Sequence, residues 1–412
     1  MTKNILLLVL LTILFSSCLR DECNETRKFV QYNPVLTTTA QFRAKEITTL
    51  KGAALKNPGK IYFYKNYLLI NEAGKGIHFF DISEAASPKE VIFYSILGNF
   101  DMAIKDDFLY ADNVIDLLKI DISDIGKPVL NQRIENFNNQ YTTTNQNHIA
   151  YYEKTNVVQE LDCRQNGGFF FFQNGGFFLD NAFSRRDVLQ TGSVGNQNIG
   201  IGGSTARFTF AQNYLYTVDQ SSIRTWDPSS MAKLDERQLG WGIETIFPLK
   251  DKLFIGSNTG MFIFRIEPNG QPSLQSSFTH ARACDPVVAN ENTAYVTLRT
   301  GTGCAGNNNQ LDIIDIKNLS LPKLIKSVPM LNPHGLALYN DKLFICEGKY
   351  GLKILETKSD DVNELAFNKN IESEDIIILD ERTALLIGPQ GFYMLDVSNP
   401  KSVKIISSIL KE

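Results

Sequence analysis

Short hydrophobic runs alternate with polar turns along almost the whole chain. Runs such as 67–70, 108–111 and 343–345 are rich in aromatic and branched residues, and a pair of polar residues precedes most of them. This spacing is typical of short strands joined by hairpins. Few stretches show the 3.6-residue hydrophobic period of an amphipathic helix. The pattern therefore predicts an all-β protein.

Acidic residues end one of these runs at intervals of about 40 residues. The eight positions are Asp81, Asp121, Asp162, Asp227, Glu267, Asp315, Glu356 and Asp396. Four short antiparallel strands in each interval are typical of a propeller blade. We predict a β-propeller of about eight four-stranded blades, or of seven if the irregular unit ending at Asp162 is not a blade. The ring closes either by direct face packing or through a lead-in strand near 41–50. The strands of the first unit are expected at 60–64, 67–71, 76–82 and 90–96.

Two stretches of the later units resemble a known repeat. Two sequences are similar to the LVIVD repeat, Leu-Asp-Ile-Ile-Asp-Ile at 311–316 and Leu-Asp-Val-Ser-Asn-Pro at 395–400. The resemblance extends over about 60–412. Proteins of this family are exported bacterial β-propellers, often lipoproteins, and mostly have no assigned activity. The resemblance implies the same architecture here. It leaves the function open, because propellers support many unrelated tasks.

The N-terminus resembles a bacterial lipoprotein signal. Lys3 precedes an apolar run at 5–15, which is too short to span a bilayer and fits the core of a secretory signal. Ser16 and Ser17 then stand directly before Cys18, as small residues do in the lipobox, where the cysteine is acylated. The alternative is an ordinary cleaved signal followed by a chance cysteine. We predict lipidation at Cys18.

This interpretation divides the chain into three parts. Residues 1–17 are the expected signal peptide, 18–58 a tether with the lead-in strand, and 59–412 the propeller. The acidic pair Asp21-Glu22, just after the lipid cysteine, resembles a surface-export signal of some bacterial lipoproteins. We therefore expect an exported protein of the outer membrane or cell surface, attached to the membrane by its lipid anchor.

The third unit carries an insertion of about 164–204, between Asp162 and Asp227, that is rich in glycine and phenylalanine. The sequence Gln-Asn-Gly-Gly-Phe-Phe occurs at 165–170 and again at 173–178. Exposed apolar clusters mark contact surfaces, so an adhesive loop against a partner or membrane is one interpretation. A loop that folds its aromatics onto its own blade is the other, and we favour it. The candidate contact residues are Phe169, Phe170, Phe171, Phe172, Phe177 and Phe178.

Composition excludes several function classes. The 412 residues include 41 basic and 45 acidic side chains, so the net charge is −4. There is no basic excess to neutralise phosphates, and nucleic-acid binding through net charge is not expected. With 43% hydrophobic residues, the chain is not disordered as a whole.

Cysteine and histidine spacing gives little support to metal or covalent chemistry. Cys284 and Cys304 flank a polar turn, and export permits a disulfide between them, which would contribute about 3 kcal/mol. Cys346 lies in a strand run, and we expect a buried free thiol there. No CxxC or His-x-x-x-His spacing occurs, nor does GxSxG, a P-loop or HExxH. We predict no metal and no cofactor.

One set of charged residues is expected to converge in space. The first strand of each blade lines the channel of a propeller, so the opening residues of these strands gather at one mouth. The candidates are Asp101, Glu244, Asp285, His334 and Asp375. Carboxylates around one mouth can hold a cation or a sugar. Wet channel mouths also tolerate polar residues without a function, and we favour that interpretation.

These observations lead to one expected function and one alternative. We expect a monomeric, non-enzymatic envelope lipoprotein whose propeller binds or scaffolds a protein or glycan partner. The alternative is an envelope enzyme that acts on glycans through the channel mouth.

Overall fold

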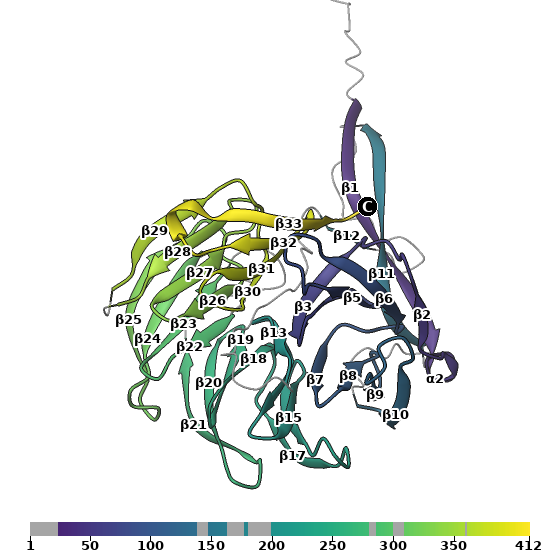
Figure 1. Cartoon of the computed structure of the whole chain (residues 1–412), viewed down its shortest axis with the longest axis horizontal. Helices are drawn as coiled ribbons and strands as arrows, with labels where there is room; N and C mark the ends of the chain where they lie inside the picture. The colour runs from purple at the N-terminus through teal and green to yellow at the C-terminus, as the bar shows by residue number, and fades with distance from the viewer. Residues whose placement is uncertain are drawn as a thin grey trace, which may run out of the picture. The chain divides into compact units, whose positions relative to one another are not determined.

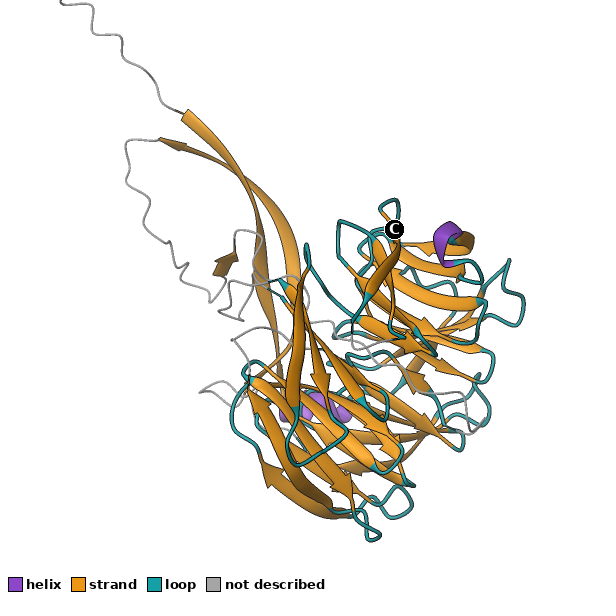
Figure 2. Ribbon diagram, turned by 90° about the vertical axis from the view of Figure 1, so that its left-hand side faces the viewer, coloured by secondary structure: helices purple, strands orange, loops and turns teal. Residues whose placement is uncertain are grey.

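The computed structural model describes residues 24–137, 147–162, 177–179, 199–279, 286–299, 309–358 and 361–412. Two compact units are present, Met1–Pro34 with Glu153–Asn181, and Val35–Tyr152 with Ala182–Glu412. Strands make up most of the described chain (Figure 2), and its helical segments are α2 (Thr39–Ala44) and η1 (Pro400–Ser402). In those residues no helix is long and apolar enough to cross a membrane. The all-β prediction is confirmed.

The second unit is a β-propeller (Figure 1). The described residues form seven blades, each with four antiparallel strands in sequence order. Blade 1 consists of β3 (Pro58–Tyr64), β4 (Tyr67–Glu72), β5 (Gly76–Asp81) and β6 (Lys89–Ser95), with β2 (Thr48–Leu50) added outside β6 and β13 (Ile201–Gly202) added inside β3. Blade 2 consists of β7 (Met102–Lys105), β8 (Phe108–Asp112), β9 (Leu117–Asp121) and β10 (Val129–Ile134).

The remaining five blades follow one another within residues 208–410. Blade 3 has β14 (Phe208–Ala211), β15 (Tyr214–Val218), β16 (Ser222–Trp226) and β17 (Lys233–Gln238). Blade 4 has β18 (Ile243–Leu249), β19 (Lys252–Ser257), β20 (Gly260–Ile266) and β21 (Pro272–Thr279). Blade 5 has β22 (Val287–Ala289), β23 (Thr293–Leu298), β24 (Gln310–Asp315) and β25 (Lys323–Pro329). Blade 6 has β26 (Leu336–Tyr339), β27 (Lys342–Cys346), β28 (Leu352–Glu356) and β29 (Asn363–Asn368). Blade 7 has β30 (Asp375–Ile378), β31 (Thr383–Gly388), β32 (Gly391–Asp396) and β33 (Lys404–Leu410).

The predicted count of eight blades is wrong, and the alternative count of seven is confirmed. The unit that ends at Asp162 is not a blade, because it forms one 16-residue strand, β11 (Asn147–Asp162). This strand belongs to a three-stranded sheet in the order β11-β1-β12, with β1 (Asn24–Thr38) in the middle. In the first unit, β12 (Phe177–Leu179) pairs with β1 so that Val30 lies opposite Leu179.

Blade 7 meets blade 1 by direct face packing. Ile377 and Leu385 of blade 7 share a buried hydrophobic cluster with Ile61 and Leu68 of blade 1. The lead-in strand expected near 41–50 is wrong over its first part, where α2 lies, and the short β2 that remains pairs with the outer strand β6 of blade 1 and does not bridge the two blades. Face packing, one of the two expected modes of closure, therefore holds the ring together.

The acidic positions of the repeat are turn formers. Oδ1 of Asp81 accepts the backbone N–H of Ser83 at 2.9 Å, and Oδ1 of Asp121 accepts that of Ser123 at the same distance. Equivalent bonds form at Asp227, Asp315 and Asp396. An aspartate that caps the backbone two residues ahead stabilises the turn between the third and fourth strands. These acidic residues recur because each of these blades needs the same turn between its third and fourth strands.

Candidate functional site

Charged residues of blades 1 to 3 meet where the inner strands begin. Lys60, Asp101 and Arg207 occupy equivalent positions in the strand registers of these blades. Asp101 forms an ion pair with Lys60, and its Oδ2 accepts the backbone N–H of Arg207 at 2.8 Å. Nε of Arg207 donates to the carbonyl oxygen of Glu244 at 3.3 Å. Two of the predicted mouth residues, Asp101 and Glu244, are therefore joined through a cationic residue.

Another mouth residue, His334, is held by a cation from the preceding blade. Nη1 of Arg299, just after β23, lies 3.1 Å from Nδ1 of His334, just before β26. Burial and the Arg299 charge hold the pKa of His334 well below its usual value, so the imidazole is neutral at pH 7. Asp375 is buried at the start of β30. Asp285 lies outside the described residues.

The channel mouth is thus a layer of mixed charge. Sequence reasoning found Asp101 there but missed Lys60, Arg207 and Arg299. Lys60 and Arg207 could have been found, because each precedes its hydrophobic run by the same offset as Asp101. Lys60 balances the charge of Asp101, and a second acid, the partly buried Asp112, lies beside it, with its Oδ1 accepting the Asp101 N–H at 2.9 Å.

Residues 199–206 run across the inner strands near the centre of the ring, where Figure 1 shows β13. β13 pairs antiparallel with β3. The N–H of Gly200 donates to the carbonyl of Ile104 in β7 at 2.9 Å, and the N–H of Ile246 in β18 donates to the carbonyl of Ala206 at 3.1 Å. The last residues of the expected insertion therefore contact the inner strands of blades 1 and 2, and Ala206, just beyond it, contacts that of blade 4.

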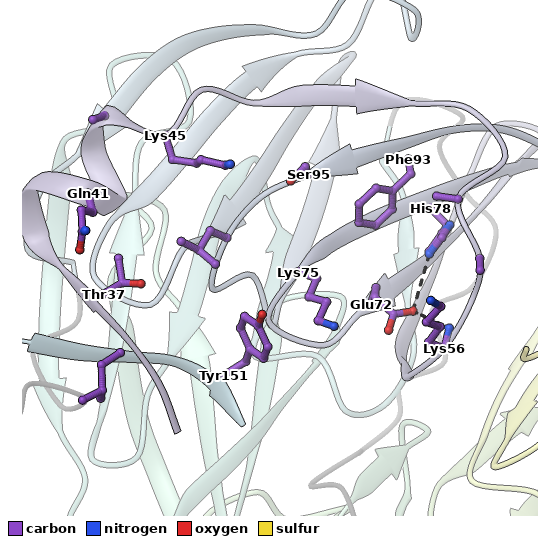
Figure 3. A pocket seen from close by; sticks show the side chains of 15 residues that line it. Thr37, Gln41, Lys45, Lys56, Glu72, Lys75, His78, Phe93, Ser95 and Tyr151 are labelled. Carbon is purple, nitrogen blue, oxygen red and sulfur yellow. Dashed lines mark hydrogen bonds and ion pairs between the residues drawn. The ribbon is translucent and has the colours of Figure 1, made fainter. Parts of the chain in front are cut away.

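A cleft of about 760 Å³ lies between residues 36–56, called here the lead-in segment, and blade 1 (Figure 3). Leu36, Thr37 and α2 contribute to one side, and β5 and β6 contribute to the other. Tyr151 of β11 also lines it. All of these residues belong to the second unit. The cleft thus combines segments that are far apart in sequence, and sequence reasoning did not find it.

Arg43 and Phe42 fix the lead-in side of the cleft to blade 2. Phe42 is 1% exposed and packs with Val114 and Ile115. The guanidinium of Arg43 donates to both oxygens of the fully buried Asp116, at 3.0 and 3.1 Å. Burial opposes ionisation of Asp116, but hydrogen bonds from Arg43, from the Asn136 N–H and from Arg133 hold its pKa below the usual value. The bidentate ion pair stabilises this wall.

We expect low pH to detach residues 39–50 from blade 2. Because the pKa of Asp116 is lowered in the folded state, its stabilising contribution is present above the unfolded pKa of about 3.9 and is lost as the pH falls through the lower folded value. Hydrogen–deuterium exchange, corrected for its intrinsic pH dependence, should show residues 39–50 losing protection below about pH 4 while β27 stays protected. Asp116→Asn should show the same loss at neutral pH. Full protection of 39–50 in that variant would contradict this role.

Glu72 and His78 form the buried floor of the cleft. Glu72 accepts the backbone N–H groups of Lys56 and Asn57 at 3.0 and 2.6 Å. Nε2 of His78 lies 3.7 Å from Oε2 of Glu72, and its Nδ1 lies 3.3 Å from Oε1 of Glu90. Burial opposes ionisation of Glu72, but the contacts with His78 and the two N–H groups lower its pKa. Glu72 is therefore ionised at neutral pH.

The same arrangement recurs in other blades. Glu347 of blade 6 is fully buried, pairs with Lys353 at 2.7 Å and accepts the N–H groups of Leu331 and Asn332. Asp219 of blade 3 pairs with Arg224 at 2.7 Å. In each case an acid at the end of the second strand, or just after it, contacts a basic residue of the third. The recurrence indicates that Glu72 and His78 are structural and do not form an acid–base pair peculiar to this cleft.

Three exposed lysines line the cleft around this floor. Lys45 follows α2, Lys56 precedes β3, and Lys75 stands in the turn between β4 and β5. Figure 3 shows Lys75 between Tyr151 and Glu72, and its Nζ lies 5.1 Å from the centre of the Tyr151 ring. In the described part of the chain, no carboxylate lies within 4.0 Å of any of the three ammonium groups.

A second concave site, between blades 2 and 3, has the opposite character. This pocket of about 490 Å³ is lined by Arg224, Lys233 and three acids, Glu135, Asp219 and Glu236. Arg224 pairs with Asp219 at 2.7 Å and with Glu236 at 3.0 Å, and Lys233 also pairs with Glu236. Its third acid, Glu135, pairs with Arg43 at 2.8 Å, so each charged residue of this pocket has a partner of opposite charge, whereas the lysines of the blade 1 cleft have none among the described residues.

Other predicted site residues are placed only in part. Cys346 is a buried free thiol as expected, and burial raises its pKa well above the usual value. Cys18, the disulfide candidates Cys284 and Cys304, and Phe169 to Phe172 lie outside the described residues. Phe177 and Phe178 lie in β12, opposite Tyr32 and Gln31 of β1. The disulfide and the adhesive loop stay predictions.

Comparison with known proteins agrees with this architecture. Residues 100–135 and 283–329 match the sequence model of the LVIVD repeat. These segments span the four strands of blade 2 and the four strands of blade 5. The chain is a β-propeller that carries LVIVD repeats in these two blades. A search of curated proteins finds no match to it.

Solved structures share the fold at low sequence identity. The LVIVD-repeat chain is similar to the computationally designed Ika8 protein, with 11% identity, a TM-score of 0.52, and 89% and 90% of the two chains covered. It is also similar to hydrazine synthase of Kuenenia stuttgartiensis, with 14% identity, a TM-score of 0.51, and 86% and 98% covered. A chain of a mitotic checkpoint complex matches with 9% identity and a TM-score of 0.51, and 84% and 91% are covered. These likenesses concern the fold alone.

Proposed function

We propose that this LVIVD-repeat protein is a non-enzymatic binding protein anchored in the bacterial cell envelope, with the blade 1 cleft as its ligand site. The observation that carries the proposal is the set of three lysines around an open cleft, none of them paired with a carboxylate in the described residues. Concave sites of roughly 300–1,000 Å³ with convergent polar groups are the usual ligand sites of proteins.

The alternative, an enzyme acting on glycans through the channel mouth, has weaker support. Asp101, one of its expected acids, pairs with Lys60 and accepts the Arg207 N–H. Residues 199–206 also contact the inner strands of the channel. The acids Glu72 and Glu347 hold backbone N–H groups in place. Each of these contacts occupies a carboxylate or a surface that a catalytic site would need.

The anchoring part of the proposal rests on Cys18 and the apolar run before it. Each buried CH₂ of an acyl chain contributes about 0.8 kcal/mol, so two or three chains hold a protein firmly on a membrane. We expect Cys18→Ala to move the protein from the membrane fraction to the soluble fraction of fractionated cells. Cys346→Ala is the matched control, because that buried thiol has no part in anchoring. Membrane retention of the Cys18→Ala protein would rule out a lipid anchor at this residue.

A further inference from the structure

We propose that the blade 1 cleft binds an acidic oligosaccharide, with its lysines holding the carboxylates of uronic-acid residues. This inference deepens the proposed function and rests on it. The first support is charge. Lys45, Lys56 and Lys75 surround one cleft in a chain whose net charge is −4, so the positive charge is concentrated locally and not a property of the whole protein. A cleft lined by one sign of charge concentrates ligands of the opposite sign.

The second support is the charge of the floor. Glu72 is the one carboxylate among the residues that line the cleft, and His78 and two backbone N–H groups already contact it. The cleft therefore keeps an excess of positive charge after its internal contacts are made. An anionic ligand could accept charge-assisted hydrogen bonds from these lysines.

The third support is the mixture of neutral groups. Tyr151 and Phe93 give the cleft apolar ring surface, which suits the C–H face of a sugar. Thr37, Gln41 and Ser95 offer hydroxyl and amide groups that suit sugar hydroxyls. Oε1 of Gln41 accepts the N–H of Thr38 at 2.9 Å in the capping box of α2, which holds this side chain at the edge of the cleft.

Size and openness favour a carbohydrate over a lipid headgroup. A volume of about 760 Å³ exceeds what a single inorganic anion needs. The three lysines are exposed and the apolar surface is limited to a few side chains, so the cleft provides no deep apolar channel for an acyl chain. An extended, hydroxyl-rich anion matches these features better.

The test is a binding titration of the purified full chain with short oligouronides, namely galacturonides, mannuronides and glucuronides, at low and at physiological salt. We expect at least one of them to bind, and its methyl ester to bind about tenfold more weakly or worse because the carboxylate charge is gone. Lys75→Gln and Lys45→Gln should each weaken binding about tenfold, and added salt should weaken it further. Lys51→Gln is the matched control, because Lys51 is exposed in the same lead-in segment but does not line the cleft.

Several outcomes would overturn the proposal. They are the absence of oligouronide binding by folded protein, equal binding of the methyl ester, or equal losses in Lys51→Gln and Lys75→Gln. Binding of inorganic phosphate or phosphatidylglycerol vesicles in place of the oligouronides would assign the lysines to phosphate recognition. These results are distinguishable from failure of the proposed anchoring, because the fractionation of Cys18→Ala is measured without any glycan.

Discussion

Glu347→Ala is expected to destabilise the propeller by about 3–5 kcal/mol. Glu347 is fully buried, and its removal leaves the ammonium of Lys353, itself 7% exposed, without its carboxylate 2.7 Å away. The N–H groups of Leu331 and Asn332 lose their acceptor in the same substitution. An uncompensated buried charge together with unpaired donors is among the most costly defects in a folded protein. Chemical denaturation followed by circular dichroism measures the loss.

The control for this variant is an exposed ion pair nearby. Lys326 and Asp361 lie 2.6 Å apart, with side chains 47% and 56% exposed. Lys326→Gln should therefore change the free energy of unfolding by less than about 1 kcal/mol. The double variant Glu347→Ala with Lys353→Met should recover part of the loss, because no buried charge is left unpaired. A cost for Glu347→Ala as small as that of the control would show that water reaches this pair in solution.

The blade repeat could be read from the sequence because its determinants are local. Asp81 and Asp121 each accept a backbone N–H only two residues ahead. The hydrophobic runs at 67–70 and 108–111 form the second strands of the same blades. The first repeat of the propeller, blade 1, accordingly has its four strands within two residues of the expected bounds. Nothing in these local signals depends on how the blades meet.

The blade count depended on a contact between distant segments. The run at 149–152 has the pattern of a second blade strand, but it is part of β11, whose neighbour in the sheet is β1. These two strands begin more than a hundred residues apart in sequence. A local hydrophobic pattern predicts a strand and cannot select its partner, so the unit ending at Asp162 was counted as a possible blade.

The candidate site was harder to predict for the same reason. The lysines of the blade 1 cleft follow no motif, and the cleft exists because Arg43 and Phe42 hold the lead-in segment on blade 2. At the channel mouth, the repeat offset located Asp101, but whether its charge is free depends on Lys60 from the preceding blade. The sequence predicted which end of the inner strands carries the charged residues. Whether each charge is neutralised depends on side chains of the neighbouring blades.

Residues 199–206 illustrate how a glycine-rich stretch can be part of a core. Gly200 packs against the ring of Tyr62, and a Cβ built on it would lie 2.1 Å from Cε1 of that ring. The ring cannot easily move away, because the Tyr62 hydroxyl donates to the Gly200 carbonyl at 2.9 Å and accepts the Ile104 N–H at 3.2 Å. Glycine at this position therefore permits close contact between the segment and β3.

Gly200→Val is accordingly expected to destabilise the ring by about 3 kcal/mol, near the upper range for overpacking a closely packed site. Gly126→Ala is the control, because a Cβ there meets only the flexible Asp124 side chain at 3.2 Å. Combining Gly200→Val with Tyr62→Leu should cost less than the sum of the two single substitutions, since the smaller side chain removes the clash. Thermal unfolding measures all four proteins. Strict additivity, or a Gly200→Val cost no larger than that of Gly126→Ala, would mean that residues 199–206 leave the inner strands in solution, and the channel would then be open to a ligand.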